Sequence, residues 1–124
     1  MATTYQTPLT TLADKLVTVT TVSNTAANNV TNATAGTLYM LEADNSNNDF
    51  DDVYLKIIDA NTATPGTTQP KISLYIPAKS KQTFVFKNGH AYTAGLSLWA
   101  TRHAVYTDTP KADSGLTVKL LVTE

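Results

Sequence analysis

The side chains most able to bind a metal lie in an acidic loop at residues 44–52, with the carboxylates of Asp44, Asp49, Asp51 and Asp52. Asp44, Ser46 and Asn48 match the first three ligand positions of a calcium-binding loop, where oxygen ligands alternate along the chain. The match then fails, because the sixth position is Asp49 instead of glycine and the twelfth is Leu55 instead of glutamate. The pattern predicts a solvated loop without a metal, and a weak, non-standard calcium site is the alternative.

The two histidines, His90 and His103, are the next candidates for chemistry. Neither has a second potential ligand at a spacing typical of metal sites. His90 follows Asn88-Gly89, a turn signal that predicts the end of a hairpin. A Ser-His-Asp triad can assemble from residues far apart in sequence, but no serine lies in a nucleophile elbow. We therefore predict that the chain is not an enzyme and has no catalytic residue, metal or cofactor.

Three aromatic side chains are candidates for binding. Period-two alternation places aliphatic side chains on one face of three predicted strands, at residues 53–58, 72–76 and 96–101. Tyr54, Tyr75 and Trp99 then lie on the opposite, outer face among polar neighbours. Such aromatic residues suit protein interfaces and also platforms for sugars, unless a loop or the N-terminal arm covers them. We predict a contact surface at these residues, so that Trp99→Ala weakens assembly or binding and leaves the fold intact.

The elements that position these side chains are predicted to be β-strands. The chain of 124 residues has 23 threonines and 9 asparagines but only 15% charged residues, which favours sheets joined by asparagine-rich turns. Seven strand-like runs are separated by turn-rich segments, at residues 16–20, 37–42, 53–58, 72–76, 82–86, 96–101 and 116–122. The doubled Thr20-Thr21 before Val22 predicts a bulge in the first strand.

These runs predict an all-β fold in one domain. The expected architecture is an antiparallel β-sandwich of about seven strands, either jelly-roll-like or immunoglobulin-like. Residues 1–14 are polar and are predicted to form an extended N-terminal arm, because chain ends are seldom ordered on their own. Residues 15–124 then form the sandwich domain, whose strand order the sequence leaves open.

Charge and cysteine content exclude several classes of protein. The net charge is −1 and the pI is about 6.0, so no field attracts nucleic acid or an anionic membrane, and we predict neither as a partner. Cysteine is absent, which excludes a disulfide-stabilised secreted domain. The first residues have neither a basic start nor an apolar run, so we expect no signal peptide and synthesis in the cytoplasm.

The C-terminal part of the chain resembles a known group of proteins. Its segments are VYLKIID at 53–59, ISLYIPAKS at 72–80, QTFVF at 82–86, GLSL at 95–98 and a valine-rich final strand. Together they resemble small β-sandwich proteins encoded among the virion structural genes of tailed bacteriophages. The resemblance covers roughly residues 50–124. Lys79 departs from it, because such proteins often carry glycine at this turn.

The resemblance implies a virion structural protein made in the host cytoplasm. Its expected function is that of a capsid decoration or cement protein, which stabilises the shell through contacts with the major capsid protein or other virion proteins. A homo-oligomer is implied, and a trimer is favoured because capsid lattices offer threefold positions. The weakly charged, threonine-rich composition suits the tiling of a surface by many copies. A phage tail or fibre component and a carbohydrate-binding module are the alternatives.

Overall fold

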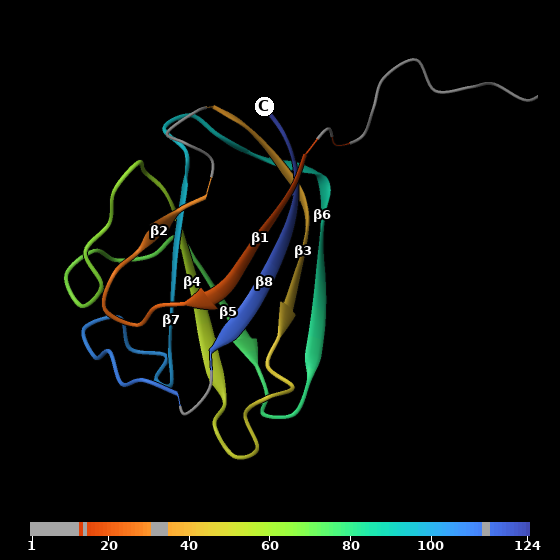
Figure 1. The fold of residues 1–124 in the computed structure, drawn as a ribbon. Helices are drawn as coiled ribbons and strands as arrows, with labels where there is room; N and C mark the ends of the chain where they lie inside the picture. The colour runs from red at the N-terminus through yellow and green to blue at the C-terminus, as the bar shows by residue number, and fades with distance from the viewer. Residues whose placement is uncertain (1–12, 14, 31–34, 113–114) are drawn as a thin grey trace, which may run out of the picture.

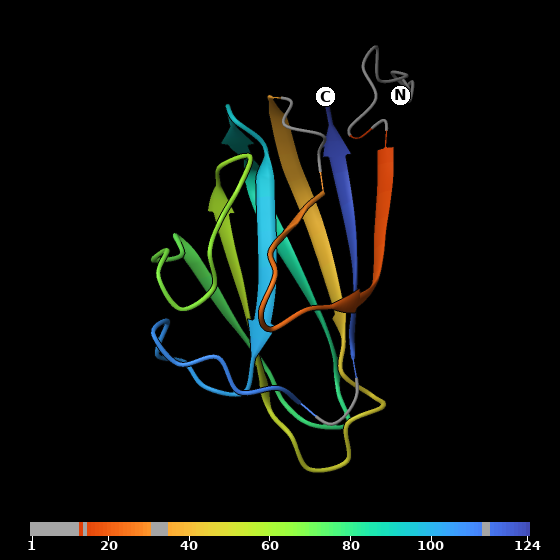
Figure 2. The ribbon, with the colours of Figure 1, turned by 60° about the vertical axis from the view of Figure 1, so that its left-hand side comes forward.

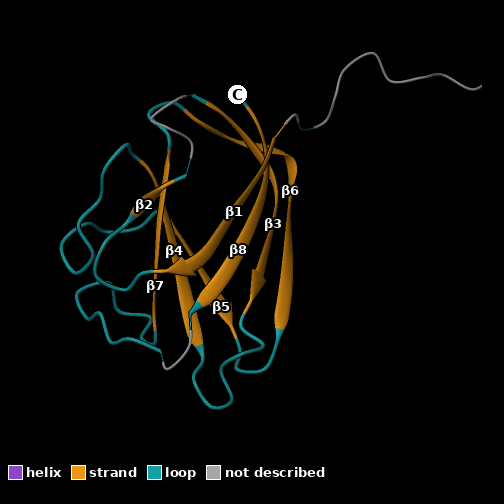
Figure 3. Ribbon diagram, viewed as in Figure 1, coloured by secondary structure: helices purple, strands orange, loops and turns teal. Residues whose placement is uncertain are grey.

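The computed structural model describes residues 13, 15–30, 35–112 and 115–124, and every regular element in these ranges is a β-strand (Figures 1 and 3). The strands are β1 (Lys15–Val22), β2 (Asn28–Asn29), β3 (Gly36–Asp44), β4 (Val53–Asp59), β5 (Ile72–Ile76), β6 (Lys81–Tyr92), β7 (Leu96–Thr101) and β8 (Leu116–Thr123). Across these ranges there is no helix that could span a membrane. The arm predicted for residues 1–14 falls outside the described residues, except for Ala13.

The strands form two antiparallel sheets of four strands each, which pack face to face (Figure 2). Sheet A has the order β1-β8-β3-β6, and sheet B has the order β2-β7-β4-β5. This arrangement confirms the predicted all-β sandwich and gives the strand order. The additional strand is β2, which has two residues and is therefore too short to show alternation in the sequence.

The core lies between the two sheets and consists of the aliphatic face of each strand. Its members have at most 7% of their surface exposed. They include Leu38, Leu41, Val118, Leu120 and Val122 from sheet A, and Val53, Leu55, Ile57, Leu96 and Leu98 from sheet B. Burying each such side chain stabilises the fold by about 1.5–3 kcal/mol relative to leaving it exposed. The alternation of the sequence therefore identifies the inward faces of β4, β5 and β7 correctly.

The bulge predicted in the first strand is confirmed. Val19 of β1 pairs with Val118 of β8, and Val22 pairs with Leu116, so β1 contains one residue more than β8 over this stretch. The extra residue shifts the alternation by one position, which allows Val22 to face the core after Val19.

The predicted hairpin turn at Asn88-Gly89 is wrong. Both residues lie inside β6, with φ angles of 65° and 79°, where the register between β3 and β6 shifts. A side chain at position 89 would collide with Thr37 of β3. Asparagine and glycine tolerate positive φ in a bulge as well as in a turn, so the dipeptide alone does not distinguish the two.

The connection from β6 to β7 is held by Asp59 at the end of β4. Its carboxylate accepts hydrogen bonds from the backbone N–H groups of Thr93 at 2.9 Å and Ala94 at 2.8 Å. These bonds lower the pKa of Asp59 from its ordinary value, because they favour the charged form. The chain therefore turns at residues 93–95, beyond the Asn88-Gly89 bulge.

Candidate functional site

The predicted exposure of Trp99 on the outer face of sheet B is wrong, because Trp99 is fully buried. It lies opposite Lys56 of β4, which is also fully buried. Residues 102–110 cover this part of the sheet, where Lys56 Nζ donates to the carbonyl oxygens of His103 at 2.9 Å and Val105 at 3.2 Å. Alternation identifies the outer face of β7 but does not show that a loop covers it. Without exposed surface, Trp99 is not a contact residue of the folded chain.

Lys56 is the one fully buried cation in the described part of the chain, and it fastens the covering loop to sheet B. Its third hydrogen bond goes to Thr101 Oγ1 at 2.8 Å. Burial lowers the pKa of the ammonium group, and the nearby charge of Asp108 acts in the opposite direction. An ammonium that donates three hydrogen bonds has no free lone pair for nucleophilic chemistry. We therefore assign Lys56 a structural role.

The other two residues of the predicted contact surface lie together. The rings of Tyr54 in β4 and Tyr75 in β5 have centroids 5.3 Å apart and an interplanar angle of 42°. Tyr75 is 48% exposed, and Tyr54 is partly buried. The Tyr75 hydroxyl donates to Asp52 Oδ2 at 3.0 Å, and this bond raises the pKa of Tyr75. The tyrosine pair therefore forms a small aromatic patch that is joined to the acidic loop.

The acidic loop at residues 44–52 is held from inside by two buried amide side chains. Asn45 Nδ2 donates to the carbonyl oxygens of Asp51 at 2.9 Å and Ile76 at 3.2 Å. Asn48 Nδ2 in turn donates to Asn45 Oδ1 at 2.6 Å. Because buried polar groups are costly to leave unpaired, these bonds fix the backbone of the loop against the end of β5.

The carboxylates of the loop have separate partners. Hydrogen bonds from Ser46 lower the pKa of Asp44, and the backbone N–H of Ser46 lies 2.9 Å from its carboxylate. Asp51 forms an ion pair with Arg102 at 3.5 Å, and Asp52 accepts the hydrogen bond from the hydroxyl of Tyr75. Among the described residues, no three acidic or histidine side chains are grouped so that they could hold a metal ion. Three carboxylates of the loop are therefore engaged by different partners, Asp44 by Ser46, Asp51 by Arg102 and Asp52 by Tyr75.

Phe50 lies in this loop and is 89% exposed, more than any other large apolar residue that the structure describes. Its neighbour Asp49 is exposed as well. The sequence analysis considered only the carboxylates of the loop and therefore missed Phe50. The available signal is a single phenylalanine in a run of polar residues between two strands. The hydrogen bonds of Asn45 and Asn48 hold the backbone that carries this side chain.

The outer face of sheet A carries an apolar row that the sequence analysis also missed. Leu16, Leu121, Met40 and Val85 lie opposite one another across β1, β8, β3 and β6. Leu16 is 63% exposed and Val85 is 74% exposed. Each of the four comes from a different strand, so only the strand order and register bring them together. We call these four residues the apolar row.

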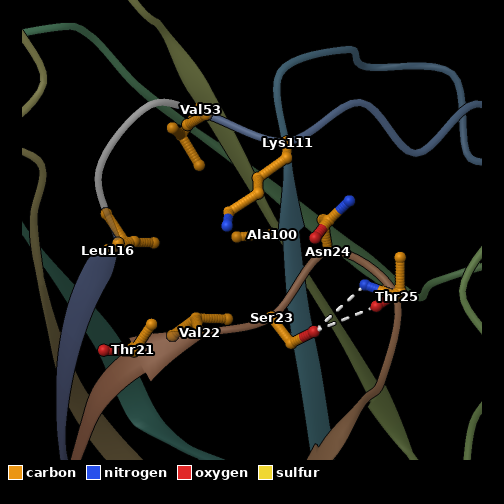
Figure 4. Close-up of a pocket in the computed structure, with 11 residues that line it drawn as sticks. Thr21, Val22, Ser23, Asn24, Thr25, Val53, Ala100, Lys111 and Leu116 are labelled. Atoms are coloured by element: carbon orange, nitrogen blue, oxygen red, sulfur yellow. Dashed lines mark hydrogen bonds between the residues drawn. The ribbon is translucent and has the colours of Figure 1, made fainter.

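A hollow of about 340 Å³ opens between the end of β1 and the segment before β8 (Figure 4). Val53 and Leu116 contribute aliphatic side chains to its lining, and the side chain of Lys111 points into it (Figure 4). Ser23 Oγ, at its rim, accepts hydrogen bonds from the backbone N–H groups of Thr25 and Ala26, both at 3.1 Å. The described residues that line the hollow include no carboxylate and no imidazole.

The two histidines have different partners and different settings. His103 Nδ1 lies 2.6 Å from Asp108 Oδ2, and both side chains are largely exposed. His90 lies within β6 instead of at a hairpin end, and its ring centroid is 6.0 Å from that of Phe86. Neither arrangement is a metal site or part of a described catalytic triad.

Comparison of the chain with known protein families, with curated proteins and with solved structures gives no match. The surfaces of the molecule are therefore the remaining guide to its function. In the described part of the chain, the exposed large apolar residues form two sets: Phe50, Tyr75 and Val105 come from sheet B and its loops, and Leu16 and Val85 from sheet A.

Proposed function

We propose that this chain is a non-enzymatic structural protein of a virion, namely a capsid decoration protein that binds the major capsid protein or another virion protein. The observation that carries the proposal is the exposure of Phe50 on a loop that is fixed by the buried amides of Asn45 and Asn48. The resemblance of residues 50–124 to phage virion proteins supports the same function.

A fixed loop is a favourable support for a contact residue. Association orders flexible groups, at about 0.5–1.5 kcal/mol for each side chain that is immobilised. The hydrogen bonds of Asn45 order the acidic loop in the free protein, so binding needs less further ordering. A phenyl ring also supplies a large apolar contact while it loses few rotatable bonds. Phe50 therefore suits the centre of a contact.

The surroundings of Phe50 indicate the chemistry of the partner surface. Asp49 and Asp52 are exposed, and they lie on either side of Phe50 along the chain. Tyr75 and Val105 add apolar surface on sheet B. A complementary partner has an apolar pocket with basic side chains at its rim, because charges of opposite sign favour encounter and orientation.

The strength expected of this contact fits decoration of a shell. A well-buried aromatic anchor contributes about 2 kcal/mol or more to a protein interface. A particle offers many equivalent sites, so modest contacts made by many copies together stabilise the shell. This role requires a rigid domain with a suitable surface and requires no catalytic group.

The copy number of the chain in purified particles from its source tests the proposal. Quantitative mass spectrometry compares the amount of this chain with that of the major shell protein. We expect on the order of tens to hundreds of copies per particle, as tiling of a shell requires. A few copies would assign the chain to a tail or fibre instead. Absence from particles would overturn the proposal, and binding in a glycan screen would then support a carbohydrate-binding module.

A pair of variants tests the role of Phe50 in attachment. We expect Phe50→Ala to reduce the amount retained on particles at least tenfold, because the anchor is lost. Asn47→Ala is the matched control, since Asn47 is an exposed polar residue of the same loop, and we expect full retention. Both variants should unfold at the wild-type urea concentration. Equal retention of the two variants would show that Phe50 is not the anchor.

A further inference from the structure

We propose that the outer face of sheet A is an interface between two copies of this chain, related by a twofold axis. The inference is independent of the virion role, because it concerns a face that does not contain Phe50 and can be tested on the isolated protein. It rests on the apolar row and on the charged residues that lie beside it.

The charged residues form a second row across the same four strands. Thr18, Lys119, Glu42 and Thr83 lie opposite one another on β1, β8, β3 and β6. Each of them is two residues from a member of the apolar row, and therefore faces the same side of the sheet. Lys119 is exposed, and Glu42 is partly exposed. We call these four residues the charged row.

The two rows complement themselves when the face meets a second copy. A twofold axis parallel to the strands and midway between β8 and β3 places β8 over β3 of the other copy, and β1 over its β6. Lys119 then faces Glu42 of the second copy, and Glu42 faces its Lys119. In the apolar row, Leu121 faces Met40 and Leu16 faces Val85. Each charged or apolar side chain therefore meets a suitable partner twice, as an interface with twofold symmetry requires.

The same order of residues identifies a second copy as the occupant. On the two middle strands, β8 and β3, the apolar row has Leu121 and Met40. The charged row has the cation Lys119 and the anion Glu42 on the same two strands. A surface of uniform charge would favour a different partner of opposite charge, whereas this order of charges fits its own image. The sequence favoured a trimer only by reference to capsid lattices, while this face fits a twofold axis.

The dimensions of the face set the expected strength of the dimer. Four strands about 4.8 Å apart, with about eight residues at about 3.3 Å each, give a face on the order of 500 Å² per copy. This is at the lower end of specific interfaces. A shallow hollow of about 230 Å³, lined in part by Met40, Glu42 and Lys119, leaves space for the long side chains of the other copy. We therefore expect a reversible dimer with a dissociation constant on the order of micromolar.

Charge reversal with mixing tests the interface directly. Lys119→Glu alone and Glu42→Lys alone each place like charges opposite each other twice, so we expect each variant to raise the dissociation constant at least tenfold. An equimolar mixture of the two variants places opposite charges together at both positions. Sedimentation velocity should therefore show a heterodimer in the mixture at a concentration where each variant alone is monomeric.

The mixture also separates the interface from effects within one chain. Each single variant places like charges in the cross-strand pair of Lys119 and Glu42, which weakens the sheet itself. Mixing does not relieve that repulsion, so a recovered dimer reports contact between copies. Lys71→Glu, the same charge change at an exposed site next to sheet B, should dimerise like the wild type.

Three results would overturn the proposal. The first is a wild-type chain that stays monomeric up to concentrations on the order of millimolar, well above the expected dissociation constant. The second is a dimer that both charge-reversal variants leave unchanged, which would place self-association on another surface. The third is a full-length monomer that dimerises only when residues 1–12 are removed, since this segment would then be the occupant of the face.

Discussion

The two sheets differ in what lies over their outer faces. Residues 102–110 cover the part of sheet B formed by β4 and β7, where Lys56 and Trp99 are fully buried, while Tyr75 of β5 remains 48% exposed. Sheet A leaves Leu16 and Val85 largely exposed, and no described segment covers them. A face covered by its own chain accommodates a tryptophan, and it accommodates a cation as well where the loop supplies hydrogen-bond acceptors, as it does for Lys56. An uncovered apolar row remains available to another molecule.

This difference explains why composition alone is a poor guide to a contact surface. The largest aromatic residue, Trp99, stabilises the monomer, whereas Leu16 and Val85 are smaller and lie on the accessible face. The accessible surface depends on which face the loops leave open, in addition to the types of residue that each strand contains.

The largest effect is expected for Trp99→Ala. Truncating a buried tryptophan leaves a cavity and should lower the free energy of unfolding by about 3–5 kcal/mol. Tyr75→Ala, at the half-exposed end of the aromatic patch, should cost less than about 1.5 kcal/mol. Urea denaturation measures both values. Similar losses for the two variants would show that the covering loop does not bury Trp99.

The amide network of the acidic loop should have the next largest effect. Asn45→Ala leaves buried carbonyl groups without their donor, and it should cost about 1–3 kcal/mol. Asn47→Ala, in the same loop but exposed, should change stability by less than about 0.5 kcal/mol. Hydrogen exchange of the loop amides should become faster only in the first variant. Unchanged exchange there would contradict the rigid display of Phe50.

The buried cation under the loop predicts a dependence on pH. Burial lowers the pKa of Lys56 below its ordinary value of 10.5, so between the two values the unfolded chain binds more protons than the folded chain. The contribution of Lys56 to stability should therefore become more favourable as the pH rises through this window. Urea denaturation of the wild type and Lys56→Met at several alkaline pH values isolates this term. A difference that is constant with pH would exclude a lowered pKa.

The smallest effect on stability is expected on the exposed face. Val85→Thr should change the free energy of unfolding by less than about 0.5 kcal/mol, because the side chain is 74% exposed. The same variant should weaken the dimer, since the apolar row loses a contact at two places. Urea denaturation at low protein concentration and sedimentation velocity measure the two effects. A large loss of monomer stability would show that Val85 packs within its own chain.

Features that depend on neighbouring residues could be predicted from the sequence. The bounds predicted for β5 and β7 are confirmed, because aliphatic alternation there is strong and turn residues flank it. The bulge of β1 also follows from a local break in alternation at Thr20-Thr21. The inward faces of β4, β5 and β7 follow from the same alternation.

Features that depend on distant segments could not be predicted in this way. The loop that covers Trp99 is held by hydrogen bonds from Lys56 to His103 and Val105, which are far from Lys56 in the sequence. The apolar row depends on the order β1-β8-β3-β6, which alternation does not contain. Asn88 and Gly89 have the positive φ angles that both a hairpin turn and a bulge require. Only the pairing of β6 with β3 shows that they form a bulge.

The central contrast between a covered and an uncovered face is most directly tested by the fluorescence of Trp99, the only tryptophan of the chain. We predict a blue-shifted emission maximum and weak quenching by acrylamide in the native protein, at concentrations where it is monomeric. Unfolding in urea should shift the emission to the red and expose the ring to the quencher. A native protein whose tryptophan emits and is quenched like the unfolded chain would place Trp99 on the surface. The contrast between the two sheets would then be lost.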